Sequence, residues 1–340
     1  MALRRPALTG LEIGKISVRL DPETAAIGSG VGPTDKQLER RLIWRLTRSV
    51  LEADNYKHRR YGEKSRQTWP VFETLIGFFG VLLKMVNLYE KGYQNAIRIV
   101  VNRLDLRFDN LPAAFDGYTL LHLTDLHPDF IPGYAHRIFD RIRNLSYDAC
   151  VMTGDFRGGT RGGIKRSMDA METIVGGIRA TDGIYATLGN HDSHLMVDPL
   201  EQMGVIVLAN ESAVISRNGD RIHITGIDDP YYYYTDRAIA ALEESPEGFK
   251  IAMVHTPALF DAADDNGYRL YLCGHTHGGQ ICLPGGYPII THVKHGRKYY
   301  RGLWRYGKMT GYTSQGCGTV GIPVRFNTQS EVTLIKLHRA

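Results

Sequence analysis

The chain has 340 residues, which is long enough for one large domain or for one domain with an appendage. A composition of 43% hydrophobic and 23% charged residues is ordinary for a globular protein and excludes wholesale disorder. The net charge is only +5, and residues 35–68, with ten basic and five acidic side chains, account for all of it. No general nucleic-acid-binding surface is therefore expected.

Four cysteines are scattered along the chain without a CxxC pair, which favours reduced thiols in a cytosolic protein. Arg4 and Arg5 stand near the start, but the residues behind them include Glu12 and Lys15 and form no apolar core, so we expect no cleaved signal peptide. Residues 1–33 contain several Gly and Pro, and we expect them to form an extended or poorly ordered arm.

Residues 34–96 are predicted to form a basic amphipathic helical hairpin. The first helix begins after Thr34, with Gln37 as its capping-box partner, and the second starts near Pro70 and continues to about Ala96. Apolar residues repeat at helical spacing along the first helix, at Leu38, Leu42, Leu46 and Val50. Another face of the same helix carries Arg41, Arg45 and Arg48.

Two interpretations of this hairpin stay open. In the first, the helices pack on the rest of the chain and leave a solvated basic face. In the second, they form a platform on an anionic membrane, with basic residues near the headgroups and Phe72, Phe78 and Phe79 in the interface. The apolar stretch Thr74 to Leu83 is about half of the roughly 20 residues that span a bilayer, so a cytoplasmic protein, peripheral on the inner membrane, is expected in that case.

Residues 97–340 show strands alternating with helices, which indicates a layered α/β domain. Six short apolar runs in this region end at or beside a residue type that binds metal, and they begin at Thr119, Ala149, Ile184, Ile222, Ile251 and Leu270. Such runs are typical of buried strands, and in open α/β sheets ligands gather beyond the carboxyl ends of the strands. The sequence therefore predicts one polar site at the rim of a sheet.

The side chains at these strand ends comprise two carboxylates, one amide and four imidazoles, namely Asp125, His127, Asp155, Asn190, His255, His275 and His277. Hard oxygen and borderline nitrogen ligands without thiolate suit Mn, Fe, Zn or a similar divalent metal. Seven ligands are too many for one tetrahedral ion but suit two ions that share a carboxylate and clamp a phosphoryl group during in-line displacement. Phosphoester hydrolysis with two divalent metal ions is the predicted chemistry.

Five motifs then carry a family resemblance: DLH at 125–127, GD at 154–155, GNHD at 189–192, VH at 254–255 and GHTH at 274–277. In this order they resemble the signature of calcineurin-like metallophosphoesterases, over roughly residues 97–335. The resemblance implies an α/β fold, a four-layer α/β/β/α sandwich of two mixed sheets, with the N-terminal helices as an appendage.

The resemblance also implies a role for each motif residue. One metal would be held by Asp125, His127, Asp155 and His277, and the other by Asp155, Asn190, His255 and His275. His191 would stabilise the developing charge on the scissile phosphate and protonate the leaving oxygen, while Asp192 would orient His191. The nucleophile would be a hydroxide held by the metals.

A narrower resemblance rests on GHTHGGQICLPG at 274–285, GCGTVGIPVRF at 316–326 and FDGYTLLHLTDLH at 115–127. These segments resemble a bacterial branch of membrane-associated phosphodiesterases that includes UDP-2,3-diacylglucosamine hydrolases. The chain departs from the usual pattern of that branch at residues 128–130. The GxGxxG pattern at 316–321 precedes a strand-like segment, so we expect a tight loop near the metals instead of a dinucleotide site.

Substrate contacts beyond the metals are the least constrained part of the site. Arg157, Arg161, Tyr231 and Arg325 are candidates, with solvated charge or ordinary packing as the alternative. The leading hypothesis is a hydrolase of a phosphodiester or pyrophosphate bond, acting on a lipid-linked substrate such as UDP-2,3-diacylglucosamine. The alternatives are a protein phosphatase or nuclease on the same fold, or a membrane-binding scaffold with an inactive metal site.

Overall fold

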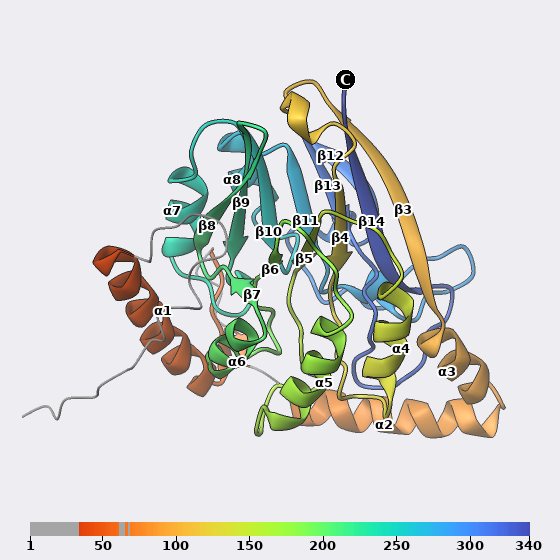
Figure 1. The fold of residues 1–340 in the computed structure, drawn as a ribbon. Helices are drawn as coiled ribbons and strands as arrows, with labels where there is room; N and C mark the ends of the chain where they lie inside the picture. The colour runs from red at the N-terminus through yellow and green to blue at the C-terminus, as the bar shows by residue number, and fades with distance from the viewer. Residues whose placement is uncertain (1–33, 61–64, 67–68) are drawn as a thin grey trace, which may run out of the picture.

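A computed structural model describes residues 34–60, 65–66 and 69–340, so the arm expected at residues 1–33 lies outside the described part of the chain (Figure 1). Two six-stranded sheets form the centre of the fold. The first sheet contains, in spatial order, β3 (Ile99–Phe108), β14 (Ser330–Arg339), β4 (Thr119–Leu123), β5 (Ala149–Met152), β6 (Ile184–Ala186) and β7 (Val205–Val207). The second contains β12 (Gly302–Tyr306), β13 (Met309–Thr313), β11 (Leu270–Cys273), β10 (Phe249–Val254), β9 (Asp220–Ile227) and β8 (Glu211–Arg217).

Both sheets are mixed, as the sequence predicts. In the first, β4 to β7 run parallel, whereas β14 pairs antiparallel with β4 and parallel with β3. In the second, β9, β10, β11 and β13 are parallel and the edge strands β8 and β12 are antiparallel to their neighbours. The central strands β5, β10 and β11 are buried along their whole length, which explains why each is a continuous apolar run.

Helices cover the outer faces of the two sheets. Side chains from both sheets, such as Val151 and Ile251, form one core between them. A second core lies between the first sheet and three helices, α4 (Tyr134–Ile142), α5 (Lys165–Val175) and α6 (Val197–Gln202). A third core lies under α7 (Arg237–Glu243) and α8 (Phe260–Asp265) on the second sheet. Figure 1 shows α4 and α5 in front of the first sheet.

The first N-terminal helix begins where the sequence predicts. Helix α1 (Asp35–Ala53) has Thr34 as its N-cap, whose hydroxyl accepts from the Gln37 N–H, and the Gln37 side chain accepts in return from the Thr34 N–H at 2.8 Å. The second predicted helix is wrong in its extent, because it is divided into α2 (Trp69–Met85) and α3 (Tyr89–Ile97). Asn87 between them has φ of 55°, a left-handed conformation that ends α2 and that asparagine tolerates well.

Helix α1 points its arginine face toward the rest of the protein. Both interpretations from the sequence were wrong on this point, because one placed the arginines in solvent and the other placed them near lipid headgroups. Arg48 is buried, and Arg41 and Arg45 form ion pairs with carboxylates of the catalytic domain. The apolar stripe is instead exposed, and Val50 retains 68% of its accessible surface. Carboxylates on the surface beneath α1 explain this orientation, since they give the arginines partners there.

Helix α2 lies across the lower end of the molecule in Figure 1. Its Leu83 packs with Ile322 and Val324 of the loop before β14, and Phe79 packs against the same cluster, so Phe79 is not one of the outward-facing aromatic residues that the membrane interpretation assumed. Phe78 is 73% exposed. No helix in the described residues combines the length and the hydropathy that a membrane crossing requires.

Candidate metal centre

The structure brings the seven predicted ligands together at one end of the two sheets. Asp125 and His127 follow β4, Asp155 follows β5, and Asn190 follows β6. His255 follows β10, and both remaining histidines follow β11. All seven side chains are buried, and they come from both sheets. The rim predicted from the six strand ends is therefore a single cluster.

The donor atoms form two groups of three, and a third group, His127, Asp155 and His191, shares one member with each of them. In one, the atoms of Asp125, His127 and His277 lie within 4.8 Å of one another. The other contains Asp155, His255 and His275 within the same limit. Asn190 Oδ1 joins the second group at 3.1 Å from His255 Nε2. In each group several lone-pair donors lie close together, an arrangement that a bound divalent cation stabilises.

Backbone carbonyls fix the orientation of the imidazoles. His127 Nδ1 donates to the Arg157 carbonyl and His255 Nδ1 to the Thr153 carbonyl, both at 2.7 Å, and His277 Nδ1 donates to Gly318 O at 3.3 Å. These bonds direct Nε2 of each ring into the cluster. Nε2 of His127 is buried without a hydrogen-bond partner, a costly state that a cation would relieve, and His275 presents Nδ1 to the cluster, 3.2 Å from His255 Nε2. The donor set therefore fits divalent metal ions.

Five of the ligands have strained backbone conformations, with positive φ at Asp125 (49°), His127 (37°), Asp155 (61°), His275 (70°) and His277 (50°). Such residues cost on the order of 1–3 kcal/mol each and persist where the surrounding structure over-determines them. Glycines make room for them. A Cβ at Gly189 would lie 2.3 Å from Asp155 Oδ1, and one at Gly274 would lie 2.1 Å from Asp125 Oδ2. The motif glycines are thus required by the closeness of the ligand carboxylates.

Charge interactions inside the cluster are strong. Burial lowers the pKa of His255, but Asp155 and Asp125 more than compensate and raise it to about 10. Burial would raise the pKa of Asp155, yet His255 and His191 hold it well below its ordinary value. Burial and His255 lower the pKa of His275. The cluster therefore holds a proton on His255 that a metal ion has to displace.

His191 and Asp192 follow Asn190 in the GNHD loop (Gly189–Asp192). The His191 ring packs edge-on against His127, with 4.9 Å between ring centroids, and its Nδ1 donates to the Gly158 carbonyl at 2.9 Å. The Asp192 carboxylate accepts from the N–H groups of Asp155, Phe156 and Gly189 at 2.7 to 2.8 Å. Asp192 thus braces the ligand loops, and Gly158 supplies the ring contact expected of Asp192.

Two of the arginines predicted to contact substrate, Arg157 and Arg325, instead donate hydrogen bonds to backbone carbonyls around the metal centre. Arg325 is fully buried and donates to the carbonyls of His277, Gln315, Gly316 and Gly318, so it joins the loop of His277 to the loop that contains Gly316 and Gly318. Arg157 donates to the carbonyls of His191, Thr160 and Gly162. These contacts argue against phosphate binding by either guanidinium. Arg161 lies on the surface, where it donates to Asn55.

Tyr231 also lies beside a metal ligand. Its ring centroid lies 5.6 Å from that of His275. The preceding turn contributes Asp229, which accepts from the N–H groups of Tyr231 and Tyr232 and so holds the backbone of the tyrosine segment. Burial raises the pKa of Asp229 to about 6.

Sequence reasoning missed the contribution of α1. Arg48 forms ion pairs with Asp228 and Glu52, and it donates to the carbonyls of Gly189 at 3.1 Å and Asp192 at 2.9 Å. Glu52 in turn accepts from Ser193 and from the His194 N–H. The helical spacing of Arg41, Arg45 and Arg48 could have indicated a common face, but no local pattern identifies Asp228, which is 180 residues away.

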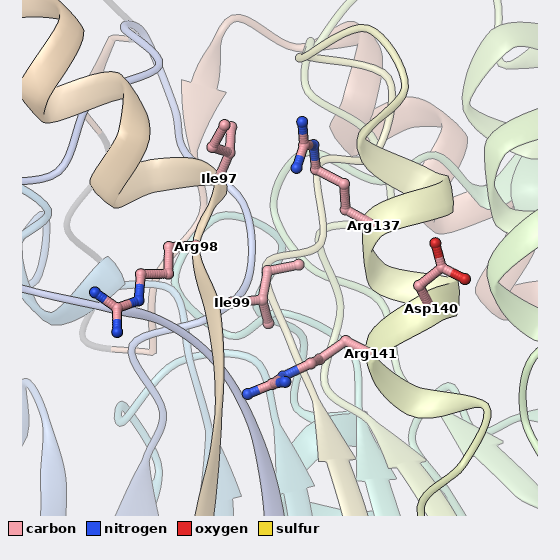
Figure 2. Close-up of a pocket in the computed structure, with 6 residues that line it drawn as sticks. All are labelled: Ile97, Arg98, Ile99, Arg137, Asp140 and Arg141. Atoms are coloured by element: carbon pink, nitrogen blue, oxygen red, sulfur yellow. The ribbon is translucent and has the colours of Figure 1, made fainter.

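A surface pocket of about 340 Å³ lies apart from the metal ligands, where α3 leads into β3 beside α4. Figure 2 shows its exposed arginines, Arg98, Arg137 and Arg141, arranged around Ile99 without meeting at one point. None of the predicted site residues lines it. We therefore assign the chemistry to the cluster at the strand ends.

Residues 118–279 match the family model described as calcineurin-like phosphoesterase. The chain thus carries a calcineurin-like metallophosphoesterase domain and is a metal-dependent phosphoester hydrolase. This match includes every predicted ligand and stops before the loop that contains Gly316 and Gly318.

Similar proteins are found in several bacteria. The uncharacterized metallophosphoesterase YkoQ of Bacillus subtilis (strain 168) is 29% identical over 273 residues, which cover 76% of this chain and 98% of YkoQ. YkuE of the same organism, also an uncharacterized metallophosphoesterase, is 27% identical over 276 residues, which cover 77% of this chain and 96% of YkuE. The phosphodiesterase YaeI of Escherichia coli (strain K12) is 27% identical over 65% of this chain and 82% of YaeI.

Proposed function

We propose that this protein uses two divalent metal ions to hydrolyse a phosphodiester or pyrophosphate bond in a lipid-linked substrate, such as UDP-2,3-diacylglucosamine. One metal would be held by Asp125, His127, Asp155 and His277, and the other by Asp155, Asn190, His255 and His275. Asp155 Oδ2 lies 3.5 Å from His127 Nε2 and 3.3 Å from His255 Nε2, which supports a carboxylate shared by both sites. When bound, such ions supply Lewis acidity and lower the pKa of water.

His191 is proposed to stabilise the charge on the scissile phosphoryl group and to protonate the leaving oxygen. The Gly158 carbonyl holds Nδ1, which leaves Nε2 as the nitrogen that exchanges the proton. The His191 N–H also donates to Asp155 Oδ1 at 2.9 Å, so the position of this ring is tied to the shared carboxylate. Asp192 supports both residues by bracing the backbone around them.

The lipid part of the proposal rests on one observation: apolar side chains are exposed on the helices and loop around the metal end of the fold. On α2 and directly after it they are Leu75, Phe78, Val81, Leu82, Met85, Val86 and Leu88. On α1 they are Leu42, Ile43, Leu46 and Val50, and on the loop after η3 (His277–Gly279) they are Leu283, Tyr287, Ile289 and Ile290. Clusters of this kind are typical of interaction surfaces for lipid or protein.

The segment 316–326 connects this apolar surface to the metal ligands. At one end, a Cβ on Gly316 would lie 2.6 Å from Asp125 Cβ, and one on Gly318 would lie 2.9 Å from His127 Cβ. At the other end, Ile322 and Val324 pack under α2. An acyl chain at α2 would therefore place its headgroup within a short distance of the ligands. We accordingly propose that the protein binds peripherally at the inner membrane, through apolar contacts of residues 34–95 more than through their arginines.

The chemistry is tested with His191→Ala. We expect the variant to keep its metal, measured by elemental analysis, and to lose about 10²- to 10⁴-fold in turnover of bis(p-nitrophenyl) phosphate. Full activity in this variant would refute the role of His191. Turnover of a phosphopeptide or of single-stranded DNA in preference to a nucleotide-diphosphate lipid would instead favour the phosphatase or nuclease alternative.

The membrane part is tested with a triple variant, Leu75→Asp, Phe78→Asp and Met85→Asp, in which each side chain is already exposed. We expect it to lose flotation with anionic liposomes and turnover of a nucleotide-diphosphate lipid, while hydrolysis of bis(p-nitrophenyl) phosphate is unchanged. Leu303→Asp, an exposed position on β12, is the matched control. Equal flotation of both variants would exclude α2 as the membrane contact.

A further inference from the structure

A short strand of the N-terminal segment lies beside the metal centre. Strand β1 (Tyr56–Lys57) pairs with β2 (Ser65–Arg66), and the residue after it, His58, bridges to Tyr233. The His58 N–H donates to the Tyr232 carbonyl at 2.7 Å, and its own carbonyl accepts from the Tyr234 N–H at 2.9 Å. These backbone bonds fix β1 against the tyrosine segment that follows the GIDDP turn.

This pairing places two cations over the tyrosine rings next to His275. The Lys57 ammonium lies 4.2 Å from the ring centroid of Tyr232 and 5.5 Å from that of Tyr231. The Arg59 guanidinium lies 4.1 Å from the Tyr231 centroid. Both rings also face His275, at 5.6 and 6.3 Å between centroids. One layer of aromatic rings thus separates these cations from a metal ligand.

Lys57 differs from five arginines of the N-terminal segment. Arg40, Arg41, Arg45, Arg48 and Arg60 each form an ion pair with a carboxylate. Within the described part of the chain, by contrast, no carboxylate lies at ion-pair distance from the Lys57 ammonium. The carboxyl group of Asp229, which favours the charged form of Lys57, already accepts hydrogen bonds from the N–H groups of Tyr231 and Tyr232.

The environment of Lys57 disfavours its charge. Burial, Arg59 and Lys294 lower the pKa of Lys57 to about 8, and Asp229 opposes them only in part. The tyrosines cannot serve as counter-ions, because burial raises the pKa of Tyr232 well above its ordinary value. A half-buried ammonium held over the tyrosine rings that pack against His275, with no carboxylate at ion-pair distance, is typical of a site that receives an anion from the ligand.

We propose that Lys57, supported by Arg59, binds a second phosphoryl group of the substrate, next to the phosphoester that the metals cleave. This inference rests on the proposed function. The second phosphoryl group belongs either to a diphosphate, where it adjoins the scissile phosphorus, or to a separate phosphomonoester on the headgroup. In both cases the substrate carries more negative charge than a simple phosphodiester, and Lys57 of the N-terminal segment binds the additional charged group.

The test compares inhibitors that carry one or two phosphoryl groups. Orthophosphate, pyrophosphate and glycerol 1,3-bisphosphate are assayed as competitive inhibitors of bis(p-nitrophenyl) phosphate hydrolysis, at a fixed concentration of free metal. For Lys57→Gln we expect the inhibition constant of one of the two-phosphate compounds to rise about tenfold or more, as a charge-assisted contact is lost. The constant for orthophosphate and the kcat for bis(p-nitrophenyl) phosphate should stay unchanged.

Two further variants separate a binding role from a structural one. Lys57→Arg retains the cation and should restore most of the affinity for the two-phosphate compound. Arg40→Gln, which removes a cation from the same segment at its ion pair with Glu244, is the matched control and should change none of the constants. Which compound responds identifies the diphosphate or the phosphomonoester as the source.

Several outcomes would overturn the inference. It fails if Lys57→Gln weakens all three inhibitors equally, or none of them, or if Lys57→Arg behaves like Lys57→Gln. Absence of bis(p-nitrophenyl) phosphate hydrolysis by the wild-type protein would contradict the proposed function instead. In that case calorimetric titration of the metal-loaded protein with pyrophosphate and with orthophosphate still tests Lys57, because binding does not require turnover.

Discussion

Two clusters of charged side chains contact the GNHD loop, and they neutralise their carboxylates differently. In the metal centre, Asp125 and Asp155 face four imidazoles and require cations from solution. In the Arg48 cluster, defined as Arg48 with Asp228 and Glu52, the cation comes from helix α1. The comparison shows that two different parts of the chain hold the same loop: the metal-centre residues of 97–340 and helix α1 of the N-terminal segment.

The two clusters also differ in what they do to the loop. The metal ligands approach it through the side chains of Asn190 and Asp155. Arg48 approaches it through the backbone, since it donates to the carbonyls that flank Asn190 and His191, and its guanidinium stacks 3.4 Å from the Tyr233 ring centroid. We therefore expect damage to the metal centre to affect activity first, and damage to the Arg48 cluster to affect stability first.

The largest effect is expected for Asp155→Asn, which changes the carboxylate near both donor groups. Metal content should fall at both sites together, and turnover should drop by more than about 100-fold, because even residues that only support a ligand contribute about 10- to 100-fold. Elemental analysis after gel filtration measures the metal. Retention of one metal per chain would show that the two groups do not share Asp155.

The next largest effect is expected for Arg48→Met, which leaves Asp228 buried without its cation. Removing one partner of a buried ion pair costs about 3–5 kcal/mol, so the free energy of unfolding in urea should fall by that amount. Arg48→Lys should recover part of it, because a lysine keeps the charge but lacks the planar fork. An unchanged midpoint for Arg48→Met would mean that α1 does not support the loop.

A pH series on the wild-type protein and on His255→Gln separates the two clusters. In the chelator-treated protein, Asp155 raises the folded pKa of His255 to about 10, above the ordinary 6.5. A raised pKa contributes stability that is fully present below 6.5 and is lost as pH rises toward the folded value. The melting temperature of the wild-type protein relative to that of His255→Gln should therefore fall between pH 6.5 and 8, because the other buried histidines, whose pKa values burial lowers, contribute to both proteins alike. Above pH 8 the lowered pKa of Lys57 acts in the opposite direction, so the window ends there.

Metal binding reverses that trend. Because the metal ion must displace the proton on His255, its apparent affinity should increase by up to about tenfold per pH unit over the same window. Competition with a chelator of known affinity measures this slope. The Arg48 cluster should contribute no slope here, since a guanidinium stays protonated throughout. A metal affinity independent of pH would place the proton elsewhere.

The sequence could predict the metal centre because its information is local. Each ligand stands directly after an apolar run, and parallel strands bring their carboxyl ends to one rim, so seven positions follow from short motifs. The narrower details did not follow. The carbonyl of Gly158 that holds His191 has no side chain to mark it, and Asp192 was given a ring contact because its three backbone bonds are invisible in the sequence.

The N-terminal helices show the opposite case. The capping box at Thr34 and Gln37 correctly predicts the start of α1, and periodicity predicts its two faces but does not say which face points inward. Usually the apolar face does, whereas here Asp198, Glu201 and Asp228 draw the arginines in. The break between α2 and α3 depends on one left-handed residue, Asn87, within an otherwise helical pattern. Such choices are made by tertiary contacts between residues far apart in sequence.

The smallest effect is expected for Arg45→Ala, on the same face of α1 as Arg48. Its partner Asp198 is half exposed, and ion pairs at such positions contribute about 0.2–1 kcal/mol, so the unfolding free energy should change by less than that limit. Added salt should reduce the change further, while the effect of Arg48→Met should persist, because buried pairs are screened much less. If instead the free energy of unfolding falls by the same amount in both variants, the arginines hold α1 collectively, and the proposal that Arg48 has a separate role at the GNHD loop is wrong.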